Sequence, residues 1–530
     1  MNTKVFLGDE ALAQGAIDAG ISGAFGYPGT PSTEIMEFLL EQGNVSAQWC
    51  ANEKTALETA LGMSFSGKRS IVTMKHVGLN VAADPFMNSA LLAINGGLVI
   101  AVADDPGMHS SQNEQDSRFF ADFAGIPCLE PSNQQEAYEM ALEAFDVSEK
   151  FSLPVILRMT TRISHSRAPV RIGGKSPKEN PLKKGNPKEW TLIPAYARKN
   201  YENLLKKQKH LADWSENFPF TKITPGDEDF VVITTGIGKN YFLENCEDFG
   251  EKRPSHIHVA ALPFPQQKLR NFCEKATKIL VVEEGQPLLE KKLRGILPQK
   301  CQILGKLSGE LPEWGELNPD SVRSALGLPP REAGKSFQNL PGRPPQLCKG
   351  CPHFDSYTAI KGVSEKLKSQ FGENSVIVAS DIGCYALGVS SPLNCGETII
   401  CMGSSIGVAR GASMAGVKYA FAVIGDSTFF HSGLTGIVDA VSANSSVVIC
   451  ILDNSIVAMT GCQETILPSQ SIINAVEGLG VKKEHIRVLT PLPAHLEENE
   501  KVLLEEAEFS GPSVVIFQRE CLEALRKARK

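Results

Sequence analysis

The feature that most constrains the fold of this chain is a repeated alternation of short apolar runs with longer amphipathic segments. The apolar runs are residues 70–76, 98–105, 154–159, 230–236, 279–285, 375–383, 420–426, 447–454 and 513–518. Amphipathic stretches such as residues 52–67 lie between them. Strands that are apolar on both faces and are separated by helical patterns are typical of parallel sheets covered by helices. The sequence therefore predicts an α/β fold with several doubly wound parallel-sheet domains.

Length and two changes in composition predict how the chain is divided. A chain of 530 residues is too long for a single hydrophobic core. Residues 166–228 are rich in Lys, Pro and Gly and poor in strand patterns, and residues 326–347 are rich in proline. Such segments suit extended connectors between domains. We therefore predict domains at residues 1–165, 229–330 and 345–530, with residues 166–228 as a linker.

Charge and hydropathy exclude several classes of partner. The 53 basic and 60 acidic residues give a net charge of -7, which argues against nucleic acid as the main partner. No apolar run is long enough to predict a membrane span, and the first residues lack the apolar core of a signal peptide. The 13 cysteines fit a reducing compartment, so we expect a cytoplasmic protein with no membrane partner.

Polar residues stand where two of the predicted strands end. Gly425, Asp426 and Ser427 close one run, and Asn454 closes the next. Ligands bind at the carboxyl ends of parallel strands, and magnesium prefers oxygen ligands such as the Asp426 carboxylate and the Asn454 amide carbonyl. The backbone carbonyl of Ile456 could complete the set, and small residues at 425 and 427 would let phosphates approach the backbone. The pattern predicts a magnesium-diphosphate site, although ordinary polar turns at strand ends contain the same types of residue.

Characteristic segments occur along the whole chain as well as at these two strand ends. The spacing resembles the thiamine diphosphate motif, a GDG triplet followed at a similar distance by two asparagines, but here it is written GDS and DN. Other characteristic segments are GYPGTPSTEI, VTMKHVGLNVAADP, VADDPGMHSSQNEQD, LCKGCPH, IGCYALG, GDSTFFHSGLTG and LDNSIVAMTG. Together they resemble the alpha subunit of indolepyruvate:ferredoxin oxidoreductase. The family's magnesium ligands correspond to Asp426 and Asn454.

The resemblance implies a fold, a reaction and partners. It implies the thiamine diphosphate-binding fold, with a pyrimidine-binding domain at 1–165, a transketolase C-terminal-like domain at 229–330 and a diphosphate-binding domain at 345–530. The implied reaction is the thiamine diphosphate- and magnesium-dependent oxidative decarboxylation of a 2-oxo acid, an arylpyruvate such as indolepyruvate, to an acyl-CoA. The implied partners are coenzyme A, a second copy of the chain, a smaller beta-type subunit in a hetero-oligomer, and ferredoxin or another iron-sulfur protein.

The same resemblance gives Glu53 a catalytic role. The cofactor must lose a proton from its C2 atom, and a carboxylate hydrogen-bonded to its pyrimidine ring promotes that loss. Glu53 stands at a predicted strand-to-helix turn in CANEKTALETALG, where the family carries its catalytic glutamate. Without the resemblance, a glutamate favoured by the helix dipole would explain this position equally well.

Further candidates are chemically competent residues beside these motifs. The substrate-binding candidates, which could meet a 2-oxo-acid carboxylate, are Thr30, Lys75, His109 and Arg118. The candidates for proton exchange are His76 and His431. In IGCYALG, Gly383 and Cys384 are cofactor-binding candidates. Helix capping by Thr30 and solvated or salt-bridged basic side chains remain the structural alternatives.

The cysteines suggest an incomplete cluster site. Cys348 and Cys351 have metal-ligand spacing, and Cys384 could come near them. Related oxidoreductases hold a [4Fe-4S] cluster with a similar trio and a fourth cysteine well after the asparagine turn. The cysteines after Asn454 are Cys462 and Cys521, and neither stands at the corresponding place. Because a [4Fe-4S] cluster takes four thiolates, we expect the trio to reflect local packing rather than bound iron.

The C-terminal region departs from the family pattern. The family's alpha subunit usually continues into a ferredoxin-like module with C-x2-C-x2-C-x3-C-P runs, whereas this sequence ends in CLEALRKARK without one. We therefore expect another polypeptide to supply the electron relay. One alternative is a non-redox thiamine diphosphate-dependent decarboxylase or carboligase. A non-catalytic assembly subunit is a third reading, which Glu53, Asp426 and Asn454 together disfavour.

Overall fold

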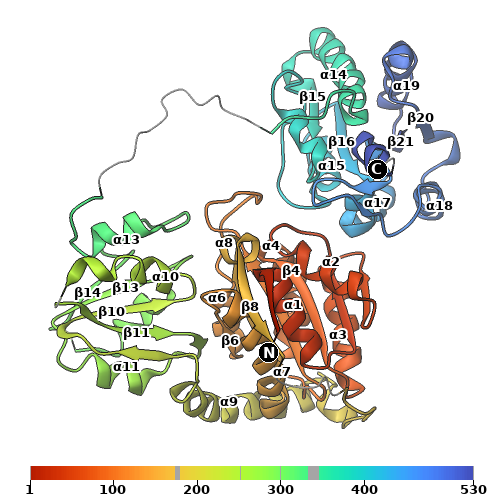
Figure 1. The fold of residues 1–530 in the computed structure, drawn as a ribbon. Helices are drawn as coiled ribbons and strands as arrows, with labels where there is room; N and C mark the ends of the chain where they lie inside the picture. The colour runs from red at the N-terminus through yellow and green to blue at the C-terminus, as the bar shows by residue number, and fades with distance from the viewer. Residues whose placement is uncertain (1, 174–178, 251, 299, 332–344, 529–530) are drawn as a thin grey trace. The chain divides into compact units, whose positions relative to one another are not determined.

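The computed structural model describes residues 2–173, 179–250, 252–298, 300–331 and 345–528 (Figure 1). The chain divides into two compact units, Met1–Ser336 and Phe337–Lys530, which we call the first and second units. No helix in the described ranges has the length and apolar character needed to cross a membrane.

The first unit contains a seven-stranded sheet in the order β12-β6-β7-β5-β4-β2-β3. The strands are β2 (Gly23–Gly26), β3 (Ser46–Trp49), β4 (Ser70–Lys75), β5 (Leu98–Asp104), β6 (Cys128–Leu129), β7 (Val155–Thr160) and β12 (Ala261–Leu262). Neighbours run parallel except β12, which pairs antiparallel with β6. Every residue of β4, β5 and β7 is buried, which explains why these runs are apolar throughout.

Helices connect these strands. They are α1 (Gly8–Asp18), α2 (Thr33–Gln42), α3 (Glu53–Phe65), α4 (His76–Val81), α5 (Ala83–Ser89), α6 (Arg118–Ala124), α7 (Gln134–Phe151) and α8 (Thr161–His165). The start of α3 is fixed by Asn52, whose side-chain oxygen accepts a 2.9 Å hydrogen bond from the Thr55 N–H. Asn133 caps α7 in the same way, accepting from the Glu136 N–H at 2.9 Å. Such caps determine where a helix begins after a strand.

The segment predicted to be an extended linker is partly regular. Strand β8 (Arg167–Ile172) pairs antiparallel with β1 (Asn2–Leu7), and α9 (Pro194–Glu216) is a helix of 23 residues. Proline is favourable at the first position of a helix, and no further proline or glycine follows before Glu216. Leu204 and Leu211 are buried on one face of α9. The helix therefore forms because local propensity and burial outweigh the composition of the segment as a whole.

A second sheet of the first unit has five strands in the order β14-β13-β10-β11-β9. The strands are β9 (Lys222–Thr224), β10 (Asp227–Thr235), β11 (Pro254–Val259), β13 (Lys278–Val282) and β14 (Gln302–Leu304), and the helices are α10 (Gly238–Leu243), α11 (Gln266–Phe272), α12 (Leu288–Leu293) and α13 (Pro319–Ala325). All pairs are parallel except β9 with β11. One cluster of buried apolar side chains includes both Val102 of the first sheet and Ile233 of the second.

The second unit is built on a five-stranded parallel sheet in the order β15-β16-β17-β21-β20. The strands are β15 (Val376–Ala379), β16 (Tyr419–Gly425), β17 (Val447–Asp453), β20 (Ile486–Leu489) and β21 (Pro512–Gln518), with a small pair β18 (Ile456–Val457) and β19 (Gln463–Glu464). The helices are α14 (Pro352–Phe371), α15 (Ser404–Met414), α16 (Asp426–Thr428), α17 (Leu434–Ser442), α18 (Gln470–Gly478), α19 (Leu496–Ala507) and α20 (Leu522–Ala528).

The sheet of the second unit is buried on both faces. Val423 belongs to one apolar cluster and its neighbour Ile424 to another, as expected when successive side chains point to opposite faces of a covered strand. The predicted α/β fold with parallel sheets is therefore confirmed. The parallel strands of this sheet end at a common edge, where Asp426 and Asn454 follow β16 and β17.

Candidate active site

Asp426 and Asn454 follow adjacent parallel strands. Gly425 of β16 lies opposite Leu452 of β17, so the residues that come next share one edge of the sheet. Both side chains are buried, with exposed fractions of 5% for Asp426 and 6% for Asn454. The two positions therefore have the neighbourhood that a shared ligand requires, and binding of magnesium by these side chains stays a prediction.

The carboxylate of Asp426 is poorly satisfied by the protein. Its Oδ1 accepts a 2.7 Å hydrogen bond from the Ser427 N–H, whereas its Oδ2 has no hydrogen-bond partner among the described residues. Burial, followed by the nearby carboxylate of Asp453, raises the pKa of Asp426 to about 7. A divalent cation here would give Oδ2 a partner and offset the repulsion between the two acids.

Asn454 holds a turn and contacts a histidine. Its Nδ2 donates to Nε2 of His353 over 3.0 Å, and burial lowers the pKa of His353 to about 4, so that the ring is neutral and accepts this bond. Its Oδ1 accepts from the Ile456 N–H at 3.2 Å, across Ser455, whose φ is +62°. An amide oxygen has two lone pairs, so Oδ1 keeps one for a metal ion while it holds the turn.

These donors fit magnesium better than a metal held by protein alone. Among the described residues, no group of three His, Cys, Asp or Glu side chains is arranged to hold a metal ion. Magnesium is usually bound through one or two carboxylates together with phosphate oxygens and water. The orphaned oxygen of Asp426 and the amide of Asn454 match that requirement, with a diphosphate completing the coordination.

Two glycines at this edge make room for an aromatic ring. A Cβ added to Gly425 would lie 2.5 Å from Cε1 of Tyr385, and one added to Gly383 would lie closer still. The Tyr385 hydroxyl donates to the Ile382 carbonyl over 2.8 Å, which fixes the ring in place. The close approach at Gly425 is thus explained within the protein, and contacts of Gly383, Gly425 and Ser427 with a cofactor remain predictions.

His431 lies just after Asp426 in the chain. It belongs to a π-helical turn, Phe429–Gly433, a conformation often found at functional sites. The imidazole is 3% exposed, and its Nδ1 is 2.6 Å from Oγ of Ser432. Its predicted role in proton exchange is not tested by this geometry.

Four cysteines line one cavity in the second unit. The cavity has a volume of about 110 Å³, and its walls include Cys348, Cys351, Cys384, Cys521 and Asn454. Burial and then the other cysteines, with Cys351 the largest contributor, raise the pKa of the Cys384 thiol to about 12. Cys521 does not stand at the place of the family's fourth cysteine in the sequence, yet it lines the same cavity as the other three. Its N–H donates to the Asn454 carbonyl at 3.2 Å, because β21 runs beside β17.

In the first unit, Glu53 and Lys75 lie at the carboxyl edge of the seven-stranded sheet. Glu53 is the first residue of α3 and is 5% exposed. Lys75 ends β4, and burial lowers its pKa to about 8, although the charges of Asp105 and Glu53 partly oppose that change. A buried titratable group whose pKa is strongly perturbed is a candidate functional residue, which keeps Lys75 among the candidates for substrate binding.

Thr30 and Lys75 are joined through one serine. The Lys75 ammonium donates to the Ser110 carbonyl at 2.9 Å, and the Ser110 hydroxyl donates to the Thr30 carbonyl at 3.2 Å. Next to Lys75, Nε2 of His76 is 3.1 Å from the carbonyl of Asn113, whereas its buried Nδ1 has no partner among the described residues. The structure thus brings three of the predicted residues to the same group of loops.

His109 and Arg118 contact the part of the unit that carries the second sheet. His109 has 54% of its side chain exposed, and its Nε2 is 3.6 Å from Oε2 of Glu316. Arg118 is completely buried and donates to the carbonyls of Glu284 and Gln286 at 3.3 and 2.8 Å. The guanidinium is fully buried and already paired with the carboxylates of Asp116 and Glu283, so its geometry lends no support to binding of a substrate carboxylate.

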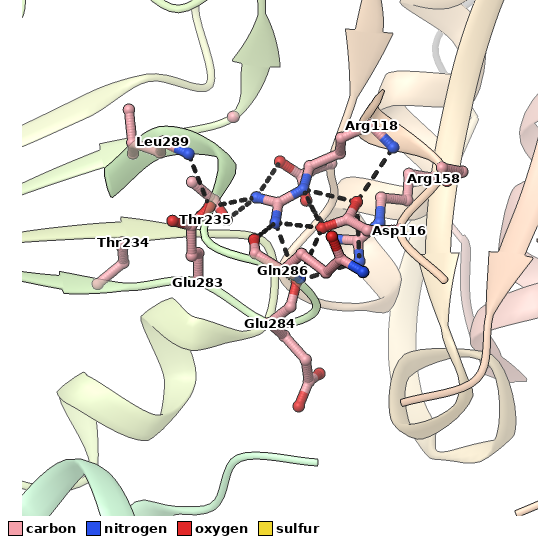
Figure 2. Close-up of polar contacts among 12 residues, drawn as sticks. Asp116, Arg118, Arg158, Thr234, Thr235, Glu283, Glu284, Gln286 and Leu289 are labelled. Carbon is pink, nitrogen blue, oxygen red and sulfur yellow. Dashed lines mark hydrogen bonds and ion pairs between the residues drawn. The ribbon is translucent and has the colours of Figure 1, made fainter. Parts of the chain in front are cut away.

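Arg118 is part of a buried ionic cluster between the two sheets (Figure 2). Its guanidinium donates to Asp116 at 2.9 Å and lies 2.9 Å from the Glu283 carboxylate. Arg158 of β7 donates to Asp104 and Glu130, both at 2.6 Å. Breaking such a cluster leaves uncompensated buried charges. We call it the Arg118–Arg158 cluster.

Sequence reasoning missed several residues of these sites. Asp453 occupies the place of the first asparagine of the family motif, and its charge contributes to the raised pKa of Asp426. His353 follows the cysteine pair in LCKGCPH, and this adjacency was the available signal for its contact with Asn454. Asp105 accepts hydrogen bonds from Ser111 and Thr161 at 2.7 Å, and it had no local signal apart from its position after a strand.

Comparisons with known proteins agree with this architecture. The family model described as "Pyruvate flavodoxin/ferredoxin oxidoreductase, thiamine diP-bdg" matches residues 14–210. The model described as "Thiamine pyrophosphate enzyme, C-terminal TPP binding domain" matches residues 381–517. Together with Asp426 and Asn454 at the edge of the sheet in the second unit, these matches indicate the class of thiamine diphosphate-dependent oxidoreductase subunits for 2-oxo acids.

The relatives narrow the class to one family. Indolepyruvate oxidoreductase subunit IorA of Archaeoglobus fulgidus is 38% identical over 99% of this chain and 88% of its own length. The IorA subunit of Methanothermobacter thermautotrophicus is 36% identical over 98% of this chain and 87% of its own. The chain belongs to the indolepyruvate oxidoreductase subunit IorA family.

A solved structure shares the fold over part of the chain. The 2-oxoglutarate:ferredoxin oxidoreductase from Magnetococcus marinus, solved with 2-oxoglutarate, coenzyme A and succinyl-CoA bound, matches with a TM-score of 0.51 and 17% identity. The match covers 61% of this chain and 65% of that one. At this identity it shows a shared fold.

Proposed function

We propose that this chain catalyses the oxidative decarboxylation of an arylpyruvate, such as indolepyruvate, to an acyl-CoA. The relatives named for indolepyruvate support the substrate class. We also propose that residues 1–165, 229–330 and 345–530 act as the pyrimidine-binding, transketolase C-terminal-like and diphosphate-binding domains. The family matches at residues 14–210 and 381–517 support the first and last of these assignments.

In this proposal the second unit holds the diphosphate. Thiamine diphosphate, when bound, supplies a carbon nucleophile and an electron sink for decarboxylation. Asp426, Asn454 and the backbone carbonyl of Ile456 bind its magnesium ion, which the unpartnered Oδ2 of Asp426 supports. The residues proposed to contact the cofactor around that ion are Gly383, Cys384, Gly425 and Ser427.

The first unit supplies the groups for proton transfer and substrate binding. Glu53 forms a hydrogen bond to the pyrimidine ring and so promotes loss of the cofactor's C2 proton. The burial of Glu53 at the carboxyl edge of the sheet supports this role. The Lys75 ammonium and the Thr30 side chain bind the substrate carboxylate, since Ser110 joins the end of β4 to the loop that carries Thr30. In this unit His76 is proposed for proton exchange and His109 for the rim of the substrate site. His431 of the second unit is a further candidate for proton exchange.

The cavity with four cysteines is the observation that favours an oxidative reaction over a non-redox decarboxylation. We propose that Cys348, Cys351, Cys384 and Cys521 hold a [4Fe-4S] cluster beside Asn454, because the four thiols line one cavity with that residue. A cluster takes one thiolate on each iron atom, so its ligands need not converge on a single ion. Electrons then leave through an iron-sulfur partner, such as ferredoxin, and we propose assembly from two copies of the chain with smaller beta-type subunits.

The test is to remove the Cys521 thiol and to measure iron content and dye reduction in the same preparation. The wild-type chain, purified without oxygen, should hold roughly four iron atoms and, with its partner, reduce a viologen dye when indolepyruvate and coenzyme A are present. Cys521→Ser should lose the iron and the dye reduction while it retains thiamine diphosphate. Cys401 is an exposed cysteine that does not line the cavity. The matched control Cys401→Ser should therefore retain the iron, the dye reduction and the thiamine diphosphate.

Two outcomes contradict the proposal. Rapid dye reduction by an iron-free preparation would show that the cysteines are not the electron path. Release of aldehyde or a carboligation product with every partner present would show a non-redox enzyme, in which case the cavity holds no relay.

A further inference from the structure

We infer that Gly78 is a positioning residue that sets where the Glu53 carboxylate lies, an inference that rests on the role proposed above for Glu53. Gly78 is buried in α4, the helix that follows β4 and Lys75. A Cβ added to Gly78 would lie 2.7 Å from Cγ and 2.8 Å from Cδ of Glu53, with Oε1 closer still. The carboxyl group of Glu53 therefore packs directly on the Cα atom of residue 78.

The conformation of the backbone does not explain the glycine. Gly78 lies in a helix and is not among the residues with positive φ, and at such a position alanine is the better helix former. What requires glycine is space, because separations under 3 Å are not tolerated between a Cβ and another carbon. Any larger residue at position 78 must therefore displace Glu53 or shift α4.

Glu53 has little freedom to move aside. The clash involves Cγ and Cδ as well as the terminal oxygen, so a rotation of the carboxyl group alone does not relieve it. The backbone of Glu53 is held by the Asn52 cap of α3, and the side chain is 5% exposed. An alanine at position 78 would thus move the carboxylate itself, the group proposed to bind the pyrimidine ring.

The expected functional effect is large because proton transfer depends on short hydrogen bonds. A catalytic group must lie within hydrogen-bond reach of the atom it serves, and a misplacement of about 1 Å can cost on the order of 10²-fold in rate. Gly78→Ala should therefore slow exchange of the cofactor C2 proton by on the order of 10²-fold. Binding of the diphosphate, which involves the second unit, should change little.

The first experiment measures packing without any cofactor. Gly78→Ala should lower the unfolding temperature of the ligand-free chain, and the same substitution in a Glu53→Ala background should not, because the clashing atoms are gone. This double-mutant cycle isolates the contact between the two residues. The matched control is Gly62→Ala in α3, where an added Cβ meets nothing within 4 Å. Equal losses of stability with and without the Glu53 side chain would overturn the inference.

The second experiment follows C2 proton exchange by NMR in the holoenzyme, with calorimetry of thiamine diphosphate binding alongside. Gly78→Ala should exchange slowly with near-normal affinity, and Gly62→Ala should behave as wild type. If Glu53→Gln exchanges at the wild-type rate, the proposed role of Glu53 falls. If Glu53→Gln is slow but Gly78→Ala is as fast as wild type, the role of Glu53 stands and the inference about Gly78 falls.

Discussion

Removing the charge of Asp426 should stabilise the metal-free chain at neutral and alkaline pH. Asp426→Asn keeps the shape and the Oδ1 acceptor for the Ser427 N–H but cannot ionise. In the folded chain, burial and Asp453 raise the pKa of Asp426 from 3.8 to about 7. A raised carboxyl pKa means that ionisation opposes folding, so its destabilising effect is absent below pH 3.8, grows between pH 3.8 and 7, and is constant above.

The pKa gives the size of this effect. At about 1.4 kcal/mol per pKa unit, a rise from 3.8 to about 7 makes folding roughly 4 kcal/mol less favourable once Asp426 is ionised. For a unit of this size, that free energy corresponds to a difference in unfolding temperature on the order of 10 °C. Calorimetry of chelator-treated protein at pH 4 and pH 8 measures it. We expect similar unfolding temperatures at pH 4 and a higher one for Asp426→Asn at pH 8.

Magnesium and thiamine diphosphate should reverse the order of the unfolding temperatures of wild type and Asp426→Asn at pH 8. A cation that binds the Asp426 carboxylate stabilises only the folded wild-type chain, so its unfolding temperature should rise on addition while that of Asp426→Asn should not. The exposed Asp439→Asn in α17 is the control and should match wild type in both conditions. A lower unfolding temperature for metal-free Asp426→Asn at pH 8 would refute the electrostatic argument. An equal response of both chains to the cofactor would refute the assignment of the metal ligand.

Three further predictions follow from other contacts. Because burial lowers the pKa of Lys75 to about 8, its cation is lost as pH rises through 8; kcat/KM for the 2-oxo acid should fall there, and Lys75→Met should have a low kcat/KM without that pH dependence. Arg118→Met should destabilise the first unit by about 3–5 kcal/mol, because Asp116 and Glu283 lose a buried partner, and an unchanged denaturation midpoint would contradict this. A cluster-free chain, such as iron-depleted wild type, should decarboxylate an arylpyruvate slowly without reducing a viologen, whereas the iron-loaded chain with coenzyme A and its iron-sulfur partner should reduce it; an anaerobic assay of both preparations measures the difference.

The sheets and their polar ends were predictable because they depend on local patterns. Runs that are apolar on both faces predict buried strands, and consecutive strands of a parallel sheet usually lie side by side. Asp426 and Asn454 follow two such strands, β16 and β17, which are indeed neighbours. The composition of residues 166–228 was a weaker guide, because it averages a proline-rich stretch with the helix-forming stretch that becomes α9.

The positions of Cys521 and Arg118 could not be read in the same way, because they depend on strand order and on packing between sheets. Cys521 reaches the cavity because β21 pairs with β17, although many residues separate the two strands in the chain. Arg118 resembles a surface arginine until the second sheet brings Glu283 against it. Both contacts are long-range, and no local period in the sequence encodes them.

The Arg118–Arg158 cluster limits where this chain can be cut for expression. A fragment that stopped after β8 would lose the carbonyl of Glu284, to which both arginines donate. It would also lose β12, which pairs with β6 at the end of the seven-stranded sheet. An uncovered strand edge is a template for aggregation. Soluble fragments and chimaeras should therefore keep the two sheets of the first unit together and place any junction between the two units.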